Sequence, residues 1–308
     1  MKIYLNQVHE DWIIDRFRSE WYQSNNDIST EEIKESNIIW IIAPWVWKKI
    51  PKKELKNKFV VCTIHHVEEL KMDKAYLKDF YERDKFVDYY HVISDKTRDQ
   101  LLQLTNKKIF NNPFWVNKNI FYEIKDKERL KNKYKLNNHY LIGSFQRDSE
   151  SKNLSKPKII KGPDRLVEIY KYFKLKNKNL KIILTGKRRD YLVDQLLKNK
   201  IDFQVYEMVD FKQLNELYNC LDLYIVASRV EGGPQAILEC AISKTPIIST
   251  DVGIASQILS KKSIFNMNNY QEAKPDINSA YRRANQLVIP SGMFEFKIFF
   301  KDIMNSLY

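Results

Sequence analysis

The sequence predicts an α/β protein made of two doubly wound domains in series. Short apolar runs alternate with polar, helix-like segments along most of the 308 residues, and this β-α-β rhythm is typical of a parallel sheet covered by helices. The rhythm is broken once, by the densely charged segment 123–139, so we place a domain boundary near residue 130. The chain is long enough for each domain to bury a core of its own.

The first domain is predicted over residues 1–130. Its strands are expected at four apolar runs: KIYL at the start, NIIWIIA near Ile41, KFVVCTI near Val61 and YYHVIS near Val92. The segments 11–23 and 72–83 have the mixed periodicity of amphipathic helices. The last segment, 294–308, also has helical spacing, and we expect it to pack back on this domain.

The second domain is predicted over residues 131–293. Its five strands are expected at YLIGSF, LKIILTG, IDFQVYEMV, DLYIVAS and TPIIST, with helices starting at Asp164, Asp190, Phe211 and Pro234. Two such domains in series are expected to leave a cleft between the carboxyl ends of their strands, where ligands of these sheets usually bind.

Composition limits the class of protein and its partners. An apolar share of 44% fits a folded, soluble chain, and a net charge of +13 suits partners that carry phosphate or an anionic membrane surface. Lysine is spread along the whole chain, so compositional drift is an equal explanation for the charge.

Cysteine usage indicates a reducing compartment, and hydropathy predicts no signal peptide or membrane-spanning segment. Cys62, Cys220 and Cys240 have neither the number nor the spacing of a disulfide framework or a zinc site. The N-terminus lacks an apolar signal core, and the longest apolar stretch, 38–47, is too short to span a bilayer. We therefore expect a cytoplasmic protein that is soluble or attached only peripherally to the inner membrane face.

The segment 221–253 is the most informative part of the chain. An apolar strand ending near Ser228 leads into a loop with Gly232 and Gly233 and then into a helix beginning at Pro234. Backbone N–H groups and a helix N-terminus in such a loop favour an anionic ligand such as a diphosphate.

Two acids in this segment, Glu231 and Glu239, are separated by seven residues. Glu231 precedes the glycines, which permit close approach of a ligand and unusual dihedral angles; its alternative role is an exposed loop acid. Glu239 lies on a mostly apolar helix, where the paired hydroxyls of a ribose would satisfy its carboxylate. The alternative for Glu239 is a solvated stripe with Gln235 and Ser243.

Two cations follow the first strand of the second domain. Arg147 and Lys161 lie near its carboxyl end, where they could clamp a diphosphate and stabilise the charge that grows as it leaves. The chain has 52 basic residues, so only this position distinguishes the two from the others.

In the first domain, His65 and His66 follow the strand VVCTI. A neutral imidazole there could hydrogen-bond a sugar hydroxyl or a reacting oxygen. Glu68 and Glu69 are close in sequence, so a metal site is an alternative, as is a packed or surface histidine.

The stretch APWVWKKIPKK combines Trp45 and Trp47 with Lys48 and Lys49. Aromatic and basic side chains together suit a membrane interface or a sugar-stacking surface. Tryptophans buried between sheet and helix are the more ordinary explanation.

Together these residues resemble the retaining GT-B glycosyltransferases of family four, the glycosyl transferases group 1. The resemblance rests on Arg147, on Lys161 with Gly162, on SRVEGGPQAILE ending at Glu239, and on TPIISTDVG ending at Gly253. In the first domain, TIHH and FNNPFWVNKNIF are similar to family segments. The resemblance implies two Rossmann-like domains facing across a cleft, the first for the acceptor and the second for the donor.

The resemblance also implies a role for each site residue. Arg147 and Lys161 would bind the donor diphosphate beside the backbone of Gly232 and Gly233, and Glu239 would hold the ribose. Glu231 would contact the transferred sugar, following Ser228. His65 would face that sugar, with His66 as the alternative, and main-chain groups near Met208 would meet the base. No metal or cofactor is expected.

Three features depart from the family pattern. NQVHEDW replaces the glycine-rich turn after the first strand, so His9, Glu10, Asp11 and Trp12 are candidates for an unusual acceptor site. Lys244 stands where glycine is common, which we take as structural. The chain is also short for the family, which implies a compact acceptor domain.

We therefore predict a retaining, metal-independent hexosyltransferase that uses a UDP- or GDP-sugar and acts in cell-surface polysaccharide biosynthesis. The acceptor would be a glycan, a lipid-linked group or another hydroxyl. The alternatives are a sugar-nucleotide epimerase of related fold and a basic nucleic-acid-binding protein. No RNA-binding signature or DNA-reading helix is evident, so we expect no nucleic-acid partner.

Overall fold

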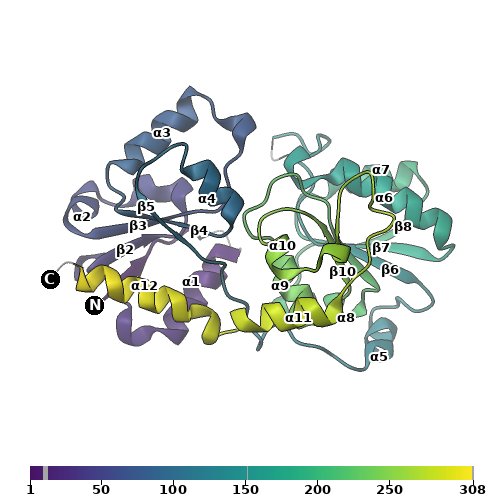
Figure 1. The fold of residues 1–308 in the computed structure, drawn as a ribbon. Coiled ribbons are helices and arrows are strands. Elements are labelled where there is room, and N and C mark those ends of the chain that lie inside the picture. The colour runs from purple at the N-terminus through teal and green to yellow at the C-terminus, as the bar shows by residue number, and fades with distance from the viewer. Residues whose placement is uncertain (10–12, 151, 307–308) are drawn as a thin grey trace. The chain divides into compact units, whose positions relative to one another are not determined.

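The computed structural model describes residues 1–9, 13–150 and 152–306. The chain divides into two compact units, the first made of Met1–Trp115 with Ile289–Tyr308 and the second of Val116–Val288. Each unit is a parallel sheet with helices packed against it (Figure 1). The α/β class and the two Rossmann-like units are as predicted.

The boundary between the units differs from the predicted one near residue 130. The segment before that residue is bonded to the second unit: the backbone N of Tyr122 donates to Asn215 Oδ1 at 3.1 Å, and that of Ile124 donates to Asn219 Oδ1 at 2.7 Å. These side-chain amides, supplied by a helix of the second unit, cannot be recognised from the charge pattern that suggested the boundary.

The first unit has a five-stranded parallel sheet in sequential order, β1-β2-β3-β4-β5. Its strands are β1 (Ile3–Leu5), β2 (Ile38–Ile41), β3 (Phe59–Ile64), β4 (Tyr89–Val92) and β5 (Lys108–Asn111). Its α-helices in the described residues are α1 (Ile13–Ser24), α2 (Lys52–Asn57), α3 (Lys74–Asp84), α4 (Asp95–Leu101) and α12 (Phe294–Asn305). The edge strand β5 is only half-buried, which explains why its short sequence KIFN carries no clear strand signal.

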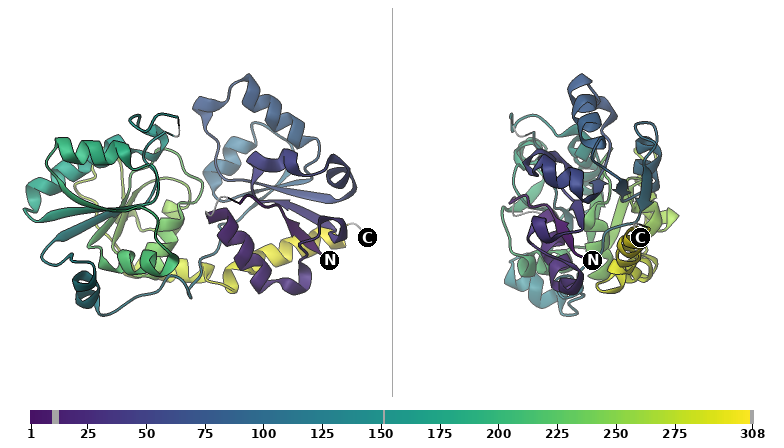
Figure 2. Two further views of the ribbon diagram at one scale, coloured as in Figure 1. Left: turned by 180° about the vertical axis from the view of Figure 1, so that it is seen from behind. Right: turned by 90° about the vertical axis from the view of Figure 1, so that its left-hand side faces the viewer.

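Side-chain alternation along β2 decides which helices cover which face of this sheet. Ile39 and Ile41 join the core beneath α2 and α3, whereas Trp40 points to the opposite face and packs 5.3 Å from Phe296 of α12. Trp21 of α1 lies 5.7 Å from Phe300, also of α12. Helix α12 therefore lies beside α1 and belongs to the first unit (Figure 2).

The second unit has a six-stranded parallel sheet in the order β11-β10-β9-β6-β7-β8. Its strands are β6 (Tyr140–Ser144), β7 (Leu180–Thr185), β8 (Asp202–Tyr206), β9 (Leu223–Val226), β10 (Ile247–Thr250) and β11 (Ile264–Phe265). Its α-helices in the described residues are α5 (Lys127–Lys133), α6 (Pro163–Lys176), α7 (Asp190–Lys198), α8 (Phe211–Cys220), α9 (Gln235–Ile242), α10 (Ala255–Ile258) and α11 (Ile277–Ala284). The five predicted strands all form.

Two helix starts in this unit follow from their local sequence. Asp210 accepts a hydrogen bond from the backbone N of Gln213 at 2.7 Å and so caps α8. Gly162 adopts a left-handed conformation with φ of 65°, and Pro163 then occupies the first turn of α6, where its missing N–H costs nothing.

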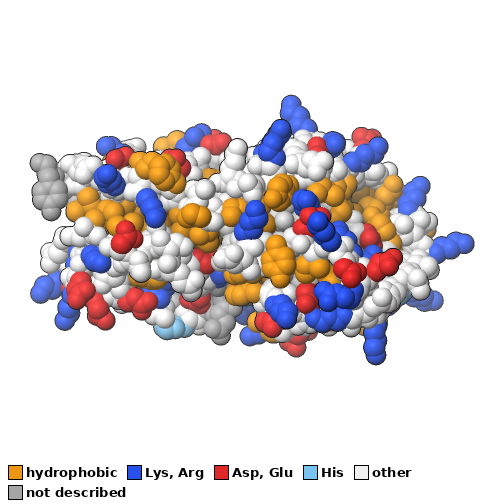
Figure 3. All heavy atoms as spheres, turned by 90° about the horizontal axis from the view of Figure 1, so that it is seen from below, with side chains coloured by type: hydrophobic (Ala, Val, Ile, Leu, Met, Phe, Trp, Pro, Cys, Tyr) orange, Lys and Arg blue, Asp and Glu red, His pale blue; other side chains and the backbone are white. Residues whose placement is uncertain are grey.

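The distribution of surface charge and the length of the helices are relevant to membrane contact. On the face drawn in Figure 3, Lys and Arg side chains are spread among acidic and apolar ones over both units. No helix in the described ranges is long and apolar enough to span a membrane.

Candidate functional site

The strand order of the second unit predicts where its ligand binds. The chain runs outward from β6 to β8 and then returns to β9 on the other side of β6, so the order reverses between β6 and β9. Ligands of open parallel sheets bind at the carboxyl ends of the strands at such a switch point. The loop after β6 carries Arg147, and the loop after β9 carries Glu231.

Lys161, Glu231 and Ser228 are in contact at this switch point. Lys161 Nζ lies 2.5 Å from Glu231 Oε1, and the two side chains are only 18% and 10% exposed. Ser228 Oγ donates to the same carboxylate oxygen at 3.0 Å. Glu231 is therefore held in an ion pair and is not an exposed loop acid.

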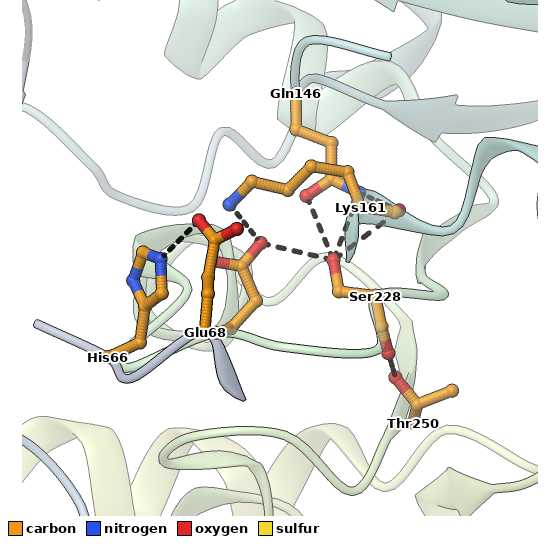
Figure 4. Close-up of polar contacts among 7 residues, drawn as sticks. His66, Glu68, Gln146, Lys161, Ser228 and Thr250 are labelled. Atoms are coloured by element: carbon orange, nitrogen blue, oxygen red, sulfur yellow. Dashed lines mark hydrogen bonds and ion pairs between the residues drawn. The ribbon is translucent and has the colours of Figure 1, made fainter. Parts of the chain in front are cut away.

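Gln146 connects this cluster to the loop after β6. Its side-chain amide donates to the backbone oxygen of Lys161 at 3.0 Å and to Ser228 Oγ at 3.3 Å. Figure 4 shows Gln146, Lys161 and Ser228 converging, with Thr250 bonded to the backbone of Ser228. Arg147, the next residue after Gln146, is partly exposed.

The segments carrying Lys161 and Glu231 are joined along their backbones. Arg229 N donates to the backbone oxygen of Ile160 at 2.7 Å, and the guanidinium of Arg229 forms two bonds of 2.7 and 2.6 Å with the carboxylate of Asp164. Arg229 holds the pKa of Asp164 below its ordinary value. We call these contacts the Arg229–Asp164 clamp.

Two glycines with positive φ allow the site loops to approach one another. A Cβ on Gly162 would lie 2.0 Å from the backbone oxygen of Ala227, and one on Gly253 would lie 2.1 Å from that of Gly232. Gly232 and Gly233 are not among the positive-φ glycines of the described residues. The unusual dihedral angles predicted for this pair thus occur at Gly162 and Gly253, because these are the points of closest backbone contact.

A buried ion pair fixes the loop that carries Arg147. Arg189 Nε lies 3.0 Å from Asp148 Oδ2 with both side chains buried, and Arg189 Nη2 donates to the backbone oxygen of Ser144 at 2.7 Å. The carboxylate of Asp148 also accepts from the backbone N of Leu192 at 3.3 Å, in the first turn of α7. The loop after β6 is therefore anchored on both sides of Arg147.

Glu239 is buried on α9 and its carboxylate is oriented. Tyr218 of α8 donates its hydroxyl to Glu239 Oε2 at 2.8 Å. Ser243 is also buried, and its hydroxyl donates to the backbone oxygen of Glu239 at 2.7 Å. The alternative of a solvated stripe is wrong, since two of its three members are buried.

Met208 lies apart from these contacts. It follows the edge strand β8, two strands from β6, and is 52% exposed. As an edge strand, β8 presents unpaired backbone groups on its outer side.

In the first unit, His65 is held in one tautomer. Its Nε2 lies 2.8 Å from the backbone oxygen of Ile42, which can only accept, so Nε2 carries the proton and Nδ1 can accept a hydrogen bond. Burial lowers the pKa of His65 to about 4, so the ring is neutral near pH 7. The ring stacks on Phe114 with 5.9 Å between centroids.

His66 is paired within its own loop. Its Nε2 lies 3.2 Å from Glu68 Oε1 (Figure 4), and this bond is the main reason that the pKa of Glu68 is lowered to about 2. Glu68 also binds Lys71 at 2.6 Å. Within the described ranges no group of three or more His, Cys, Asp or Glu side chains could hold a metal ion.

The candidate acceptor turn after β1 is only partly described. His9 has a positive φ of 59°, and its Nδ1 lies 3.2 Å from Gln7 Nε2. The other three candidates, Glu10, Asp11 and Trp12, lie outside the described residues.

Comparison with known families identifies the chain. Residues 126–288, more than half of the sequence, match the family model of glycosyl transferases group 1. The chain belongs to this glycosyl transferase family. The matched region lies within the second unit and contains the cluster of Lys161, Glu231 and Ser228 as well as the Arg229–Asp164 clamp.

Solved structures of low sequence identity share the fold of this glycosyl transferase. HepE (Alr3699) from Anabaena in complex with UDP-glucose has a TM-score of 0.71 and 12% identity, covering 93% of this chain and 94% of HepE. Sucrose-phosphate synthase from Thermosynechococcus elongatus has a TM-score of 0.70 and 12% identity, covering 98% and 81%. A glycosyltransferase from Rickettsia africae has a TM-score of 0.66 and 17% identity, covering 97% and 84%. The fold is therefore GT-B.

No curated protein has a sequence that matches this glycosyl transferase.

Several residues of its site were not predicted: Gln146, Asp148, Asp164, Arg189, Tyr218, Arg229 and Thr250. One signal was available for Thr250, since it ends a strand next to β9. The two residues of the clamp, and those of the pairs Arg189–Asp148 and Tyr218–Glu239, are far apart in sequence, so no local sequence pattern predicts that they are in contact.

Proposed function

We propose that this protein is a retaining glycosyltransferase that moves a hexose-type sugar from a UDP-sugar to a hydroxyl of a glycan or a lipid-linked acceptor. The main support is the cluster of Lys161, Glu231 and Ser228 at the switch point of a group 1 glycosyl transferase. The UDP-glucose in the HepE structure makes that compound the first donor to test.

In this proposal the second unit binds the donor. Lys161 and Arg147 neutralise the diphosphate together with the N-terminus of α9, beside the backbone of Gly232 and Gly233. Glu239, oriented by Tyr218, accepts hydrogen bonds from the ribose hydroxyls. Main-chain groups near Met208 contact the base.

Glu231 is well suited to contact the transferred sugar. Both of its hydrogen bonds from the described residues go to Oε1, so Oε2 is available to a sugar hydroxyl. Lys161 then serves two purposes, because its ammonium orients Glu231 and adds positive charge where the diphosphate leaves.

The proposed reaction occurs on one face of the sugar. The bond between the anomeric carbon and the diphosphate oxygen breaks, and the bond from that carbon to the acceptor oxygen forms on the same side. The acceptor proton moves to the departing phosphate oxygen, so no separate base is required. Configuration at the anomeric carbon is retained.

The first unit would supply the acceptor side, with His65 contacting the transferred sugar through Nδ1 and His66 as the less favoured alternative. We also propose that the enzyme needs no cofactor and acts in the cytoplasm on a precursor of a cell-surface polysaccharide. Its three cysteines are buried and free, which suits a reducing compartment.

Removing either member of the central ion pair tests this function. Lys161→Ala and Glu231→Ala should each lower kcat for transfer from UDP-glucose by at least about 100-fold, because they remove charge that stabilises the leaving diphosphate or the sugar contact. Circular dichroism should show an intact fold. Lys198→Ala is the matched control, since Lys198 pairs with Asp194 on the surface of the same unit.

Nucleotide binding provides the second measurement. UDP should raise the melting temperature of the wild-type protein, since a ligand that binds only the folded state stabilises it. Near-normal turnover in Lys161→Ala, no shift with any nucleoside diphosphate, or an epimerised nucleotide sugar formed without an acceptor would each contradict the proposal.

A further inference from the structure

The loop after β2 presents one exposed tryptophan beside His65. Trp45 is 52% exposed, and its ring centroid lies 5.8 Å from that of His65. The other tryptophan of the same stretch, Trp47, is buried, and its Nε1 donates to Asp79 at 3.2 Å. The two residues, which the sequence could not distinguish, therefore have different environments.

The position of Trp45 is that of a ligand-binding residue. It follows β2, and His65 follows the neighbouring strand β3, so both lie at the carboxyl edge of the parallel sheet. The start of the loop is fixed from β1, because the side-chain amide of Asn6 exchanges hydrogen bonds of 3.0 and 3.1 Å with the backbone of Ala43. A half-exposed aromatic side chain on a fixed loop is preorganised for binding.

Two features near Trp45 are consistent with a sugar ligand. The neighbouring Lys48 is paired with Asp79 at 2.6 Å and Glu82 at 3.5 Å, which weakens the attraction of this lysine to anionic lipid. A flat indole next to an imidazole that accepts hydrogen bonds suits a pyranose, which has an apolar C–H face and a rim of hydroxyls.

We propose that Trp45 forms an acceptor subsite that binds a sugar ring, so that the group receiving the transferred hexose is itself a saccharide, whether free or lipid-linked. This inference rests on the proposed function, in which His65 contacts the transferred sugar. In this arrangement the acceptor ring stacks on the indole, and the hydroxyl that accepts the hexose belongs to that ring.

The test uses UDP-glucose with a panel of methyl pyranosides and disaccharides of glucose, galactose and N-acetylglucosamine. Saccharides should stimulate UDP release by the wild-type enzyme. Trp45→Ala should raise the KM for the stimulating saccharide by about tenfold or more, whereas Trp45→Phe, which keeps an aromatic face, should raise it much less. Tyr81→Ala is the control, because Tyr81 is an exposed aromatic of α3 in the same unit.

The outcomes separate this inference from the proposed function. If UDP still raises the melting temperature of Trp45→Ala while its saccharide KM rises, the subsite is supported. An unchanged KM in Trp45→Ala, or a wild-type enzyme that no saccharide in the panel stimulates, would overturn it. So would loss of co-sedimentation with phosphatidylglycerol vesicles in Trp45→Ala at unchanged KM, which would assign the tryptophan to a membrane. No melting shift with nucleotides in the wild type would instead refute the proposed function.

Discussion

His65 shows how the environment of one side chain sets its chemistry. The backbone oxygen of Ile42 fixes the proton on Nε2, and burial lowers the pKa to about 4. In the unfolded chain the pKa returns to about 6.5. Between these values the unfolded state binds a proton that the folded state does not, so His65 contributes stability above pH 6.5 that is lost as the pH falls towards 4.

This linkage predicts that the free energy of unfolding depends on pH more strongly in the wild type than in His65→Gln, because glutamine cannot take the proton. The difference in free energy of unfolding should shrink by about 3 kcal/mol as the pH falls from 6.5 to 4. Urea denaturation followed by tryptophan fluorescence measures it, because all six tryptophans lie within the first 115 residues. A gap that stays constant over this range would show that burial does not depress the pKa of His65.

The contacts at the switch point of the second unit were predictable in part. Glu231 and Lys161 could be predicted because each follows a strand in a recognisable glycine-containing loop. Their direct contact at 2.5 Å could not be predicted, because the residues are far apart in the chain and the contact depends on the pairing of β6 with β9. Tyr218, the partner of Glu239, belongs to a helix that carried no functional signal.

At the scale of elements, the proposed donor site is formed by the segment before α6 and the loop after β9. Gly162 brings their backbones into contact, and the Arg229–Asp164 clamp ties them together. The clamp bonds to neither Lys161 nor Glu231, yet it holds the two segments that carry them. It should therefore act as a positioning device.

Loss of the clamp should impair catalysis more than stability. Arg229→Ala and Asp164→Ala should each lower kcat/KM for the donor roughly 10- to 100-fold, because a small displacement of catalytic groups is costly. The free energy of unfolding should change by only about 1 kcal/mol, since the pair is partly exposed. Steady-state kinetics and urea denaturation measure the two effects.

A double mutant with the charges exchanged, Asp164→Arg with Arg229→Asp, distinguishes positioning from loss of a charge near the diphosphate. Recovery of part of the lost kcat/KM would support positioning. The Lys198–Asp194 pair on α7 offers the matched exchange away from the site. Equal losses for both exchanges would contradict a specific role for the clamp.

Element prediction from the sequence succeeded for the buried strands and also for the half-exposed edge strand β8. The runs of β3 and β9 are continuous and apolar, as expected for parallel strands covered by helices. The edge strand β5, whose sequence KIFN has only two apolar residues, and the two-residue β11 were missed, because such strands have little apolar signal. The unit boundary was misplaced because it depends on the side chains of Asn215 and Asn219.

For the whole molecule, the two units carry different kinds of support. The family match falls within the second unit, whose strand order independently predicts a ligand at the switch point between β6 and β9. The first unit lies outside the family match and is covered by the compared GT-B structures, and it carries Trp45 and His65 at the carboxyl edge of its sheet. The net charge of +13 is consistent with the diphosphate-bearing donor of the proposed function.

Charge also leads to a prediction about metals for the whole enzyme. A diphosphate leaving group must be neutralised, and many sites use a divalent cation for this. In the proposed function Lys161, Arg147 and the N-terminus of α9 take that role. Excess EDTA should therefore leave kcat and the donor KM of the wild type unchanged, and added Mg²⁺ or Mn²⁺ should not raise them. A coupled assay of UDP release measures the effect of EDTA and of added metal. Lys161→Ala is the second sample, because Mg²⁺ could restore part of its activity by supplying the missing positive charge. Loss of wild-type turnover in EDTA that Mn²⁺ restores would show that the basic residues do not suffice.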